Sequence, residues 1–209
     1  MVTSYSRSAL SRCAVWVGYT PYLKYLDSIR RQDQVRIDSK LTFEKERCQQ
    51  ALDLAKEGVR VALISSGDSG IYGMAGLALE LLLEQPYQDR PSFEVHPGVS
   101  ALQMAAAKIG APLMNDFCAI SLSDGVTPWS KIQERIEAAS GSDFVIAVYN
   151  PRSGERNWQL QKALDILLQE RPKTTPIVLA RQIGRDDEQV EVHMLDSLPV
   201  QKVDMLTLI

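Results

Sequence analysis

The stretch Val59–Glu84, VRVALISSGDSGIYGMAGLALELLLE, decides the fold because it joins a strand, a tight polar turn and a helix. Residues Val61–Ser65 carry four apolar side chains in five positions, which predicts a strand buried on both faces of a parallel sheet. From Ile71 onward a helix is predicted, because apolar side chains recur at helical spacing, at Ile71, Met74, Leu77, Ala78 and Leu81.

The turn between them, SSGDSG, is the first candidate ligand site. Gly67 and Gly70 bracket Asp68 and Ser69, so the backbone can come close to a bound molecule. Open α/β sheets bind ligands at the carboxyl ends of their strands, where this turn lies. The turn could equally be a tight connection in which Ser69 or Asp68 caps the helix. These residues alone leave both interpretations open, since a single glycine turn is weak evidence.

Composition bounds the classes of function. The chain has 209 residues, 45% hydrophobic and 23% charged, which is typical of a globular protein with ample core-forming material. Its net charge of −3, without a run of Lys or Arg, argues against nucleic-acid binding. Three widely spaced cysteines and two histidines predict no metal site and favour a reducing, cytoplasmic setting. The apolar run near the N-terminus is too short for a membrane span, so no membrane association is expected.

The first half reads as alternating strands and helices. A strand at 14–17 leads into a helix near Tyr22–Arg31, followed by a polar stretch at 32–40. Thr42 can cap the next helix, which Gly58 ends. After the central strand, turn and helix, a short strand is predicted at Phe93–His96 and a helix at Val99–Ile109. This order is typical of a parallel α/β sheet.

The second half differs in topology. The segment 110–116 breaks the pattern, so we predict two α/β domains, 1–112 and 113–209. Strands are expected at 119–122 and 144–149, and helices near 130–139 and through Leu160–Leu167. Closely spaced strands near 177–180, 190–194 and 205–209 indicate a mixed sheet.

Three turns with small or polar residues follow these strands: SSGDSG at 65–70, PGVSA at 97–101 and YNPRSG at 149–154. If the two domains pack side by side, the turns can line one cleft, as ligand sites at domain interfaces commonly do.

These motifs resemble a known family. SGDSGIYGMAGLALELL at 66–82, HPGVSALQMAAAKIGAPLMNDFCAISLSDGVTPW at 96–129 and DFVIAVYNPRSGERNWQL at 143–160 are similar to the tetrapyrrole methylases of cobalamin synthesis. Within that family they resemble the subgroup that methylates C17 of precorrin-3B. The likeness extends over nearly the whole chain, and the combination of GDSGIYGMA, ISLSDGVTPW and YNPRSGER is specific to the subgroup.

The resemblance implies an S-adenosyl-L-methionine-dependent C-methyltransferase that also leads to ring contraction, giving precorrin-4. It implies two α/β domains, a cofactor in the cleft between them, an anionic tetrapyrrole substrate and a homodimer. Carried onto this chain, the cofactor-binding residues are Gly67, Asp68, Ile71, Ser100, Ala101, Tyr149 and Asn150.

Arginines are the candidates for contact with the substrate's carboxylates, because guanidinium groups pair with carboxylates in a forked geometry. Arg152 and Arg156 follow the buried strand at 144–149 and are the predicted substrate-binding residues; each could instead be a solvated surface arginine. Methyl transfer from a sulfonium is an in-line displacement that needs no protein nucleophile, so no catalytic residue is assigned.

Relative to the family pattern, the chain is expected to be shortened at both ends. The family begins with a strand and a glycine-proline loop ahead of the position of Met1, and continues past Ile209 with a further strand segment. This leaves two alternatives to an active enzyme with C17 specificity. One is a cofactor-binding domain that is inactive or depends on a partner. The other is a methylase for another position of the corrin ring.

Overall fold

The computed structural model describes residues 2–154 and 156–209 and divides into two compact units, Met1–Ser100 and Ala101–Ile209. The boundary between the units lies after Ser100, twelve residues before the domain boundary expected at 112/113, because helix α5 (Ala101–Lys108) packs within the second unit. Leu102 and Ala105 of α5 share a buried cluster there with Ala147, Ala180 and Leu208. Each unit is described by itself below.

The first unit contains a parallel sheet in the order β2-β1-β3. Its strands are β1 (Val15–Tyr19), β2 (Val35–Ser39) and β3 (Val61–Ile64). β1 lies in the centre, and its Trp16 and Val17 are 1% and 0% exposed. The central position of β1 explains its run of apolar residues, because a strand covered on both faces needs apolar side chains on both.

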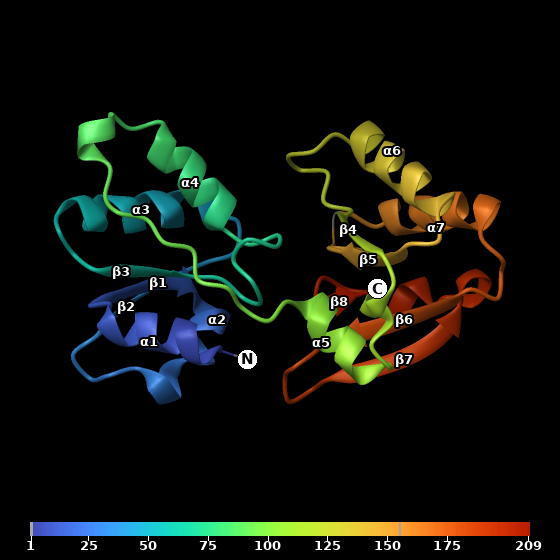
Figure 1. The fold of residues 1–209 in the computed structure, drawn as a ribbon, viewed down its shortest axis with the longest axis horizontal. Coiled ribbons are helices and arrows are strands. Elements are labelled where there is room, and N and C mark those ends of the chain that lie inside the picture. Colours follow the sequence, from blue (N-terminus) through green and yellow to red (C-terminus); the bar gives the residue numbers. More distant parts are fainter. Residues whose placement is uncertain (1, 155) are drawn as a thin grey trace. The chain divides into compact units, whose positions relative to one another are not determined.

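Helices cover both faces of this sheet (Figure 1). On one face lie α1 (Ser4–Arg12), α2 (Thr20–Lys24) and the 3-10 turn η1 (Asp27–Ile29), around a cluster that includes Trp16, Leu23 and Ile64. On the other face lie α3 (Glu44–Lys56) and α4 (Ala75–Leu83). There Val15 and Val17 of β1 pack against Ala51 of α3. A further 3-10 turn, η2 (Tyr87–Asp89), follows α4.

Three predicted features between β1 and α3 were wrong. The helix expected at 22–31 is the short α2 followed by η1, and the stretch taken as polar, 32–40, contains the edge strand β2. Polar residues are tolerated in β2 because an edge strand is only half covered. Thr42 does not cap α3; it has a φ of 70°, and Phe43 precedes the helix.

The predicted end of α3 is confirmed. Gly58 has a φ of 82°, its N–H donates to the carbonyl of Ala55, and the N–H of Val59 donates to the carbonyl of Leu54. This pair of bonds is the Schellman arrangement, which needs a left-handed residue after the helix.

Two further predictions near the central turn need correction. The helix expected from Ile71 begins at Ala75, because Ile71 to Gly73 form a turn in which Tyr72 has a φ of 53°. The strand expected at Phe93–His96 is not formed in the described residues; the segment 91–100 is irregular. Its apolar residues, with Val95 50% exposed, match a strand by pattern but are not paired in the sheet.

The strands of the second unit form two sheets, a parallel pair and an antiparallel three-stranded sheet, and not the single mixed sheet expected from the sequence. β4 (Phe117–Ser121) pairs in parallel with β5 (Val145–Tyr149). β6 (Pro176–Arg181) pairs antiparallel with β7 (Gln189–Met194) and β8 (Thr207–Leu208). Val148 and Ile209 exchange backbone hydrogen bonds in both directions, so β5 continues into the β8 edge of the antiparallel strands.

Helices α6 (Trp129–Ser140) and α7 (Gln159–Glu170) cover one face of these two sheets and α5 covers the other (Figure 1). The largest buried cluster of the second unit lies under α6 and α7 and includes Leu122, Ile132 and Leu160. Short 3-10 turns complete the unit: η3 (Pro112–Met114), η4 (Leu195–Ser197) and η5 (Val200–Lys202). Among the described residues, every helix is too short or too polar to cross a lipid bilayer.

Candidate functional site

The turn after β3 is held by the carboxylate of Asp68. Its Oδ1 accepts the backbone N–H of Gly70 at 2.8 Å, and its Oδ2 accepts the backbone N–H of Gly98 at 2.9 Å. The first bond closes the turn itself, as an Asx turn does. The second joins the turn to the segment that carries PGVSA. Asp68 therefore fixes two of the three predicted turns against each other.

Glycine is required at the contact between these two turns. A Cβ atom at Gly98 would lie 1.9 Å from the carbonyl oxygen of Gly67, which no backbone shift of ordinary size relieves. Gly67 also has a φ of 69°, a left-handed conformation that favours glycine. A Cβ at Gly73 would lie 2.6 Å from the carbonyl oxygen of Ser69, so the turn is compact at its far end as well.

Gly70, expected to allow close backbone approach, is less constrained. A Cβ at Gly70 would meet only Asp68 Oδ1, at 3.2 Å, among the described atoms. The glycines with the tightest contacts are instead Gly98 and Gly73. Gly98 is 31 residues from Gly67 in sequence, and only the folded chain shows that their backbones touch.

Helix α1 and its N-cap residue Thr3 also contact the PGVSA segment and the residue before it. The hydroxyls of Thr3 and Ser6 both donate to the carbonyl oxygen of Pro97, at 3.3 and 2.8 Å. The rings of Tyr5 and His96 lie 4.8 Å apart. The segment is irregular, but hydrogen bonds hold it both to the turn after β3 and to the start of α1.

The other first-unit candidates differ in exposure. Ile71 is 36% exposed and Tyr72 beside it 50%, whereas Ser100 is 2% exposed. The turn therefore presents an apolar side chain next to backbone polar groups, a combination suited to a flat heterocycle joined to a polar chain. These residues fit an adenosine-containing cofactor such as S-adenosylmethionine.

In the second unit, Tyr149 at the end of β5 contacts the start of α5. Its hydroxyl oxygen accepts the backbone N–H of Leu102 at 3.1 Å, and its ring packs against the cluster that Ala101 borders. Ala101 and Tyr149, two of the residues expected at the site, are far apart in sequence but border the same buried cluster.

Asn150 follows in a left-handed conformation, with a φ of 49°. Its side-chain amide donates to Ser121 Oγ at 2.9 Å, and its backbone carbonyl accepts a bond from the guanidinium of Arg156 at 2.8 Å. Asparagine tolerates this conformation better than most residues. The ends of β4 and β5 are therefore joined by side chains.

Both predicted substrate-binding arginines have structural partners. Arg156 binds the Asn150 carbonyl, and the guanidinium of Arg152 donates to the carbonyl oxygen of Val200 at 2.9 Å. Each guanidinium has further N–H groups that could bind a carboxylate. Neither arginine is a freely solvated surface residue, since both are half-buried.

A cavity of about 310 Å³ lies beside the end of β6, lined by Leu179, Arg181, Gln189, Glu191, Lys202 and Thr207. Hydrogen bonds from Lys202 and then His193 lower the pKa of Glu191. Partial burial raises the pKa of Asp204, but hydrogen bonds from Thr207 and Arg181 outweigh burial and leave it below its ordinary value. Arg181 and Lys202 thus already have acidic partners.

Sequence reasoning missed a second group of residues in SLSDGVTPW. Gln159, 2% exposed at the start of α7, donates its amide to Asp124 Oδ2 at 2.8 Å. The rings of Trp129 and Trp158 meet edge to face at 4.9 Å. Asp124 lies in the loop after β4 and Trp129 begins α6, whereas Trp158 and Gln159 lie at the start of α7, and no sequence pattern indicated that they pair.

Comparison with known proteins identifies the family. A family model described as Tetrapyrrole (Corrin/Porphyrin) Methylases matches residues 2–199. A probable cobalt-factor III C(17)-methyltransferase of Salmonella typhimurium is 43% identical and is covered over 86% of its length by this chain. A precorrin-3B C(17)-methyltransferase of a Sinorhizobium species is 39% identical, with 99% of this chain and 81% of the relative covered. A cobalt-factor III methyltransferase of Priestia megaterium is 41% identical over 99% of this chain, which spans only 38% of that longer protein.

Solved structures agree. The crystal structure of the methyltransferase CobJ aligns with a TM-score of 0.93 at 35% identity, covering 100% of this chain and 86% of that one. A uroporphyrin-III C-methyltransferase of Thermus thermophilus, complexed with S-adenosylhomocysteine, shares the fold with a TM-score of 0.71 at 18% identity, covering 99% and 88% of the two chains. The chain therefore belongs to the tetrapyrrole methylase family and is a methyltransferase of that family.

Proposed function

We propose that the chain transfers the methyl group of S-adenosyl-L-methionine to C17 of precorrin-3B, or of its cobalt-containing counterpart, with ring contraction of the macrocycle, in cobalamin biosynthesis. The observation that carries this proposal is the fixed contact between the turn after β3 and the PGVSA segment, in a chain 43% identical to a C(17)-methyltransferase. The relatives' names include both precorrin-3B and cobalt-factor III, so the proposed substrate class is an anionic corrin precursor.

The bound cofactor supplies an electrophilic methyl group. The chain's own residues bind and orient it: in this proposal the cofactor-binding residues are Gly67, Asp68, Ile71, Ser100, Ala101, Tyr149 and Asn150. The exposed backbone of the turn at Gly67 and the apolar side chain of Ile71 contact the cofactor directly. Asp68 acts mainly by position, since both its oxygens already accept backbone N–H groups.

Arg152 and Arg156 are proposed to bind acidic side chains of the substrate with the N–H groups that Val200 and Asn150 leave available. Positioning of this kind is what in-line methyl transfer needs from the protein. We further propose that the enzyme works in the cytoplasm as a homodimer.

Two measurements test the proposal. Titration calorimetry with S-adenosylhomocysteine is expected to show one site per chain, and labelled S-adenosylmethionine is expected to transfer its methyl group to precorrin-3B. Folded protein that releases no heat at high micromolar S-adenosylhomocysteine would contradict the cofactor assignment. Cofactor binding without transfer would instead favour a cofactor-binding domain that lacks activity by itself, and transfer to a different carbon, located by NMR of the product, would favour a methylase of another ring position.

A matched pair of variants tests the substrate residues. Arg156→Gln is expected to raise the KM for the tetrapyrrole while cofactor affinity changes less than twofold. Arg135→Gln, on α6, removes the same charge elsewhere in the unit and is expected to leave the KM unchanged.

A further inference from the structure

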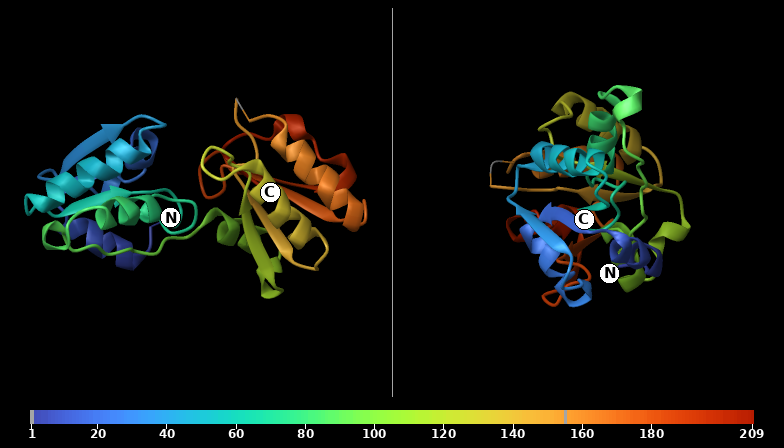
Figure 2. Two further views of the ribbon diagram at one scale, coloured as in Figure 1. Left: turned by 90° about the horizontal axis from the view of Figure 1, so that it is seen from above. Right: turned by 90° about the vertical axis from the view of Figure 1, so that its left-hand side faces the viewer.

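The outer edge of β2 is the starting point for an inference about assembly. Among the described residues β2 pairs only with β1, so one side of the strand is open (Figure 2). The N–H of Val35 donates to the carbonyl of Ala14, which shows that Val35, and by alternation Ile37 and Ser39, direct their backbone groups toward β1. Arg36 and Asp38 therefore direct their backbone N–H and C=O groups outward. Open groups of this kind are a template for another strand.

We propose that two copies of the chain associate by antiparallel pairing of β2 with β2 of the second copy, centred on Ile37. In this register Arg36 lies opposite Asp38 of the second copy, and Asp38 opposite its Arg36. Each such pair exchanges both backbone hydrogen bonds, so all the outward groups of Arg36 and Asp38 are used. The interface is self-complementary, as a two-fold dimer requires.

The charges of β2 select this register over its neighbours. A register centred on Arg36 places Arg36 opposite Arg36 of the second copy. A register centred on Asp38 places Asp38 opposite Asp38 of the second copy, and Arg36 opposite its Lys40. Like charges directly opposite each other destabilise a strand pair, whereas opposite charges stabilise it. Among the registers centred on Arg36, Ile37 and Asp38, only the one centred on Ile37 opposes unlike charges throughout. A register centred on Ser39 also opposes Asp38 to Lys40, but it leaves Arg36 opposite Thr42, beyond the end of β2.

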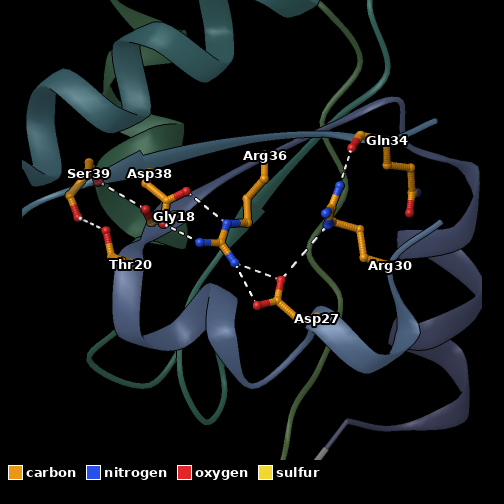
Figure 3. Close-up of polar contacts among 8 residues, drawn as sticks. All are labelled: Gly18, Thr20, Asp27, Arg30, Gln34, Arg36, Asp38 and Ser39. Carbon is orange, nitrogen blue, oxygen red and sulfur yellow. Dashed lines mark hydrogen bonds and ion pairs between the residues drawn. The ribbon is translucent and has the colours of Figure 1, made fainter. Parts of the chain in front are cut away.

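The side chains of Arg36 and Asp38 are already held in place for this contact. The Arg36 guanidinium binds both oxygens of Asp38, at 2.8 and 3.1 Å, and both oxygens of Asp27, at 2.7 and 2.8 Å (Figure 3). Asp27 also faces Arg30 at 3.9 Å, so the four charges balance within one copy. The side chain of Asp38 remains 34% exposed, which leaves it accessible to a second guanidinium.

The opposite face of β2 offers apolar surface to the same partner. A groove of about 870 Å³ runs between β2 and α3, and its lining includes Ile37, Phe43 and Leu54. Phe43 is 47% exposed and Val35, at the start of β2, 54%. Pairing centred on Ile37 places this residue beside Ile37 of the second copy and brings the second α3 over the groove. Both the backbone edge and the apolar surface are thus covered by one partner.

This interface specifies how the proposed homodimer forms and is independent of which corrin is methylated. The test uses the full chain in sedimentation velocity at tens of micromolar, where wild type is expected to be dimeric. Arg36→Glu and Asp38→Lys each place like charges opposite one another, and each is expected to weaken the dimer by about tenfold or more. When the two variants are mixed, each cross-strand pair between unlike copies again opposes an acid with a base, so the mixture is expected to regain the dimer.

Asp165→Lys on the exposed surface of α7 is the matched control and is expected to remain dimeric. Circular dichroism and S-adenosylhomocysteine binding, measured on every variant, separate loss of the interface from loss of the fold or of the proposed function. If either charge variant unfolds, Asp38→Pro replaces it, since proline is tolerated on an edge strand. Proline at this position removes an outward N–H together with the carboxylate that binds Arg36. A monomeric wild type, dimeric single variants, or a mixture that stays monomeric would each overturn the proposal.

Discussion

The two units hold their candidate site residues in place by different means. In the first unit, backbone meets backbone: Gly98 lies against Gly67, and the carboxylate of Asp68 accepts two backbone N–H groups. In the second unit, side chains tie strand ends together, as the Asn150 amide does by donating to Ser121 Oγ. The first arrangement excludes any added atom, whereas the second can adapt by changing rotamers. We therefore expect substitutions in the first unit to lower stability and cofactor affinity more than substitutions in the second.

The largest effect is expected at Gly98. Gly98→Ala puts a methyl group 1.9 Å from the Gly67 carbonyl oxygen, so the two turns must separate. We expect a loss of stability of more than about 3 kcal/mol in the first unit and loss of S-adenosylhomocysteine binding. Thermal unfolding and calorimetry measure both.

Gly76→Ala is the matched control for Gly98→Ala. Gly76 lies in α4, and no described atom lies within 4 Å of its added Cβ, so alanine should stabilise the helix by about 0.5–1 kcal/mol. Equal behaviour of the two variants would show that backbone contact does not define the first-unit site.

The second prediction concerns Asp68. Asparagine keeps one acceptor oxygen, so Asp68→Asn should retain one of the two backbone bonds and lose about 2 kcal/mol, while Asp68→Ala should lose both. Cofactor affinity is expected to fall in the same order, as titration calorimetry would show. Asp89→Asn, on the exposed η2, is the control. An unchanged affinity in Asp68→Ala would mean that the turns are aligned by their glycines alone.

Tyr149 gives the third, smaller effect. Tyr149→Phe removes the acceptor for the Leu102 N–H but keeps the ring in its apolar cluster, so about 1 kcal/mol of stability should be lost. Because the second-unit site is joined by several side chains, cofactor affinity should fall less than in Asp68→Ala. Tyr87→Phe, 84% exposed in the first unit, is expected to change neither quantity. A larger loss of affinity in Tyr149→Phe than in Asp68→Ala would show that the second unit, and not the first, is the more sensitive to substitution.

The sequence predicted the elements whose periodicity is strong and local. The second-unit helices and the glycine-terminated α3 could be anticipated because each depends on residues within a few turns of one helix. The single mixed sheet could not, because which strands pair depends on how distant segments pack. β2 could not, since its Arg36 and Asp38 look like a polar loop until the strand is known to lie at an edge. At 93–96 the error was the reverse, because a strand was predicted and none is formed. Alternating apolar residues show that a segment can pair in a sheet, but not that a partner strand is available.

The same limit applies to the site. Gly67 and Asp68 stand out in the sequence, because glycine beside a short acid after an apolar strand is a local signal. The roles of Gly98 and Gln159 are not local: one depends on the backbone of Gly67 and the other on Asp124, each more than thirty residues away. Contacts across such separations are fixed by the packing of whole elements, which no short pattern encodes.

The smallest effect is expected from the charges that border the cavity beside β6. Hydrogen bonds from Lys202 and His193 lower the pKa of Glu191 in the folded protein, so the unfolded chain binds a proton there more readily. The contribution to stability is therefore present above the ordinary pKa of a glutamate and is lost as the pH falls through the lowered value. In thermal melts, Glu191→Gln should be slightly less stable than wild type at pH 7, and the difference should vanish at acidic pH. Glu170→Gln, on the exposed end of α7, should show no such difference at either pH. A difference in melting temperature between Glu191→Gln and wild type that stays constant across this pH range would mean that Glu191 stabilises the second unit by packing and not by charge. That result would contradict the view that polar side chains hold the second unit together.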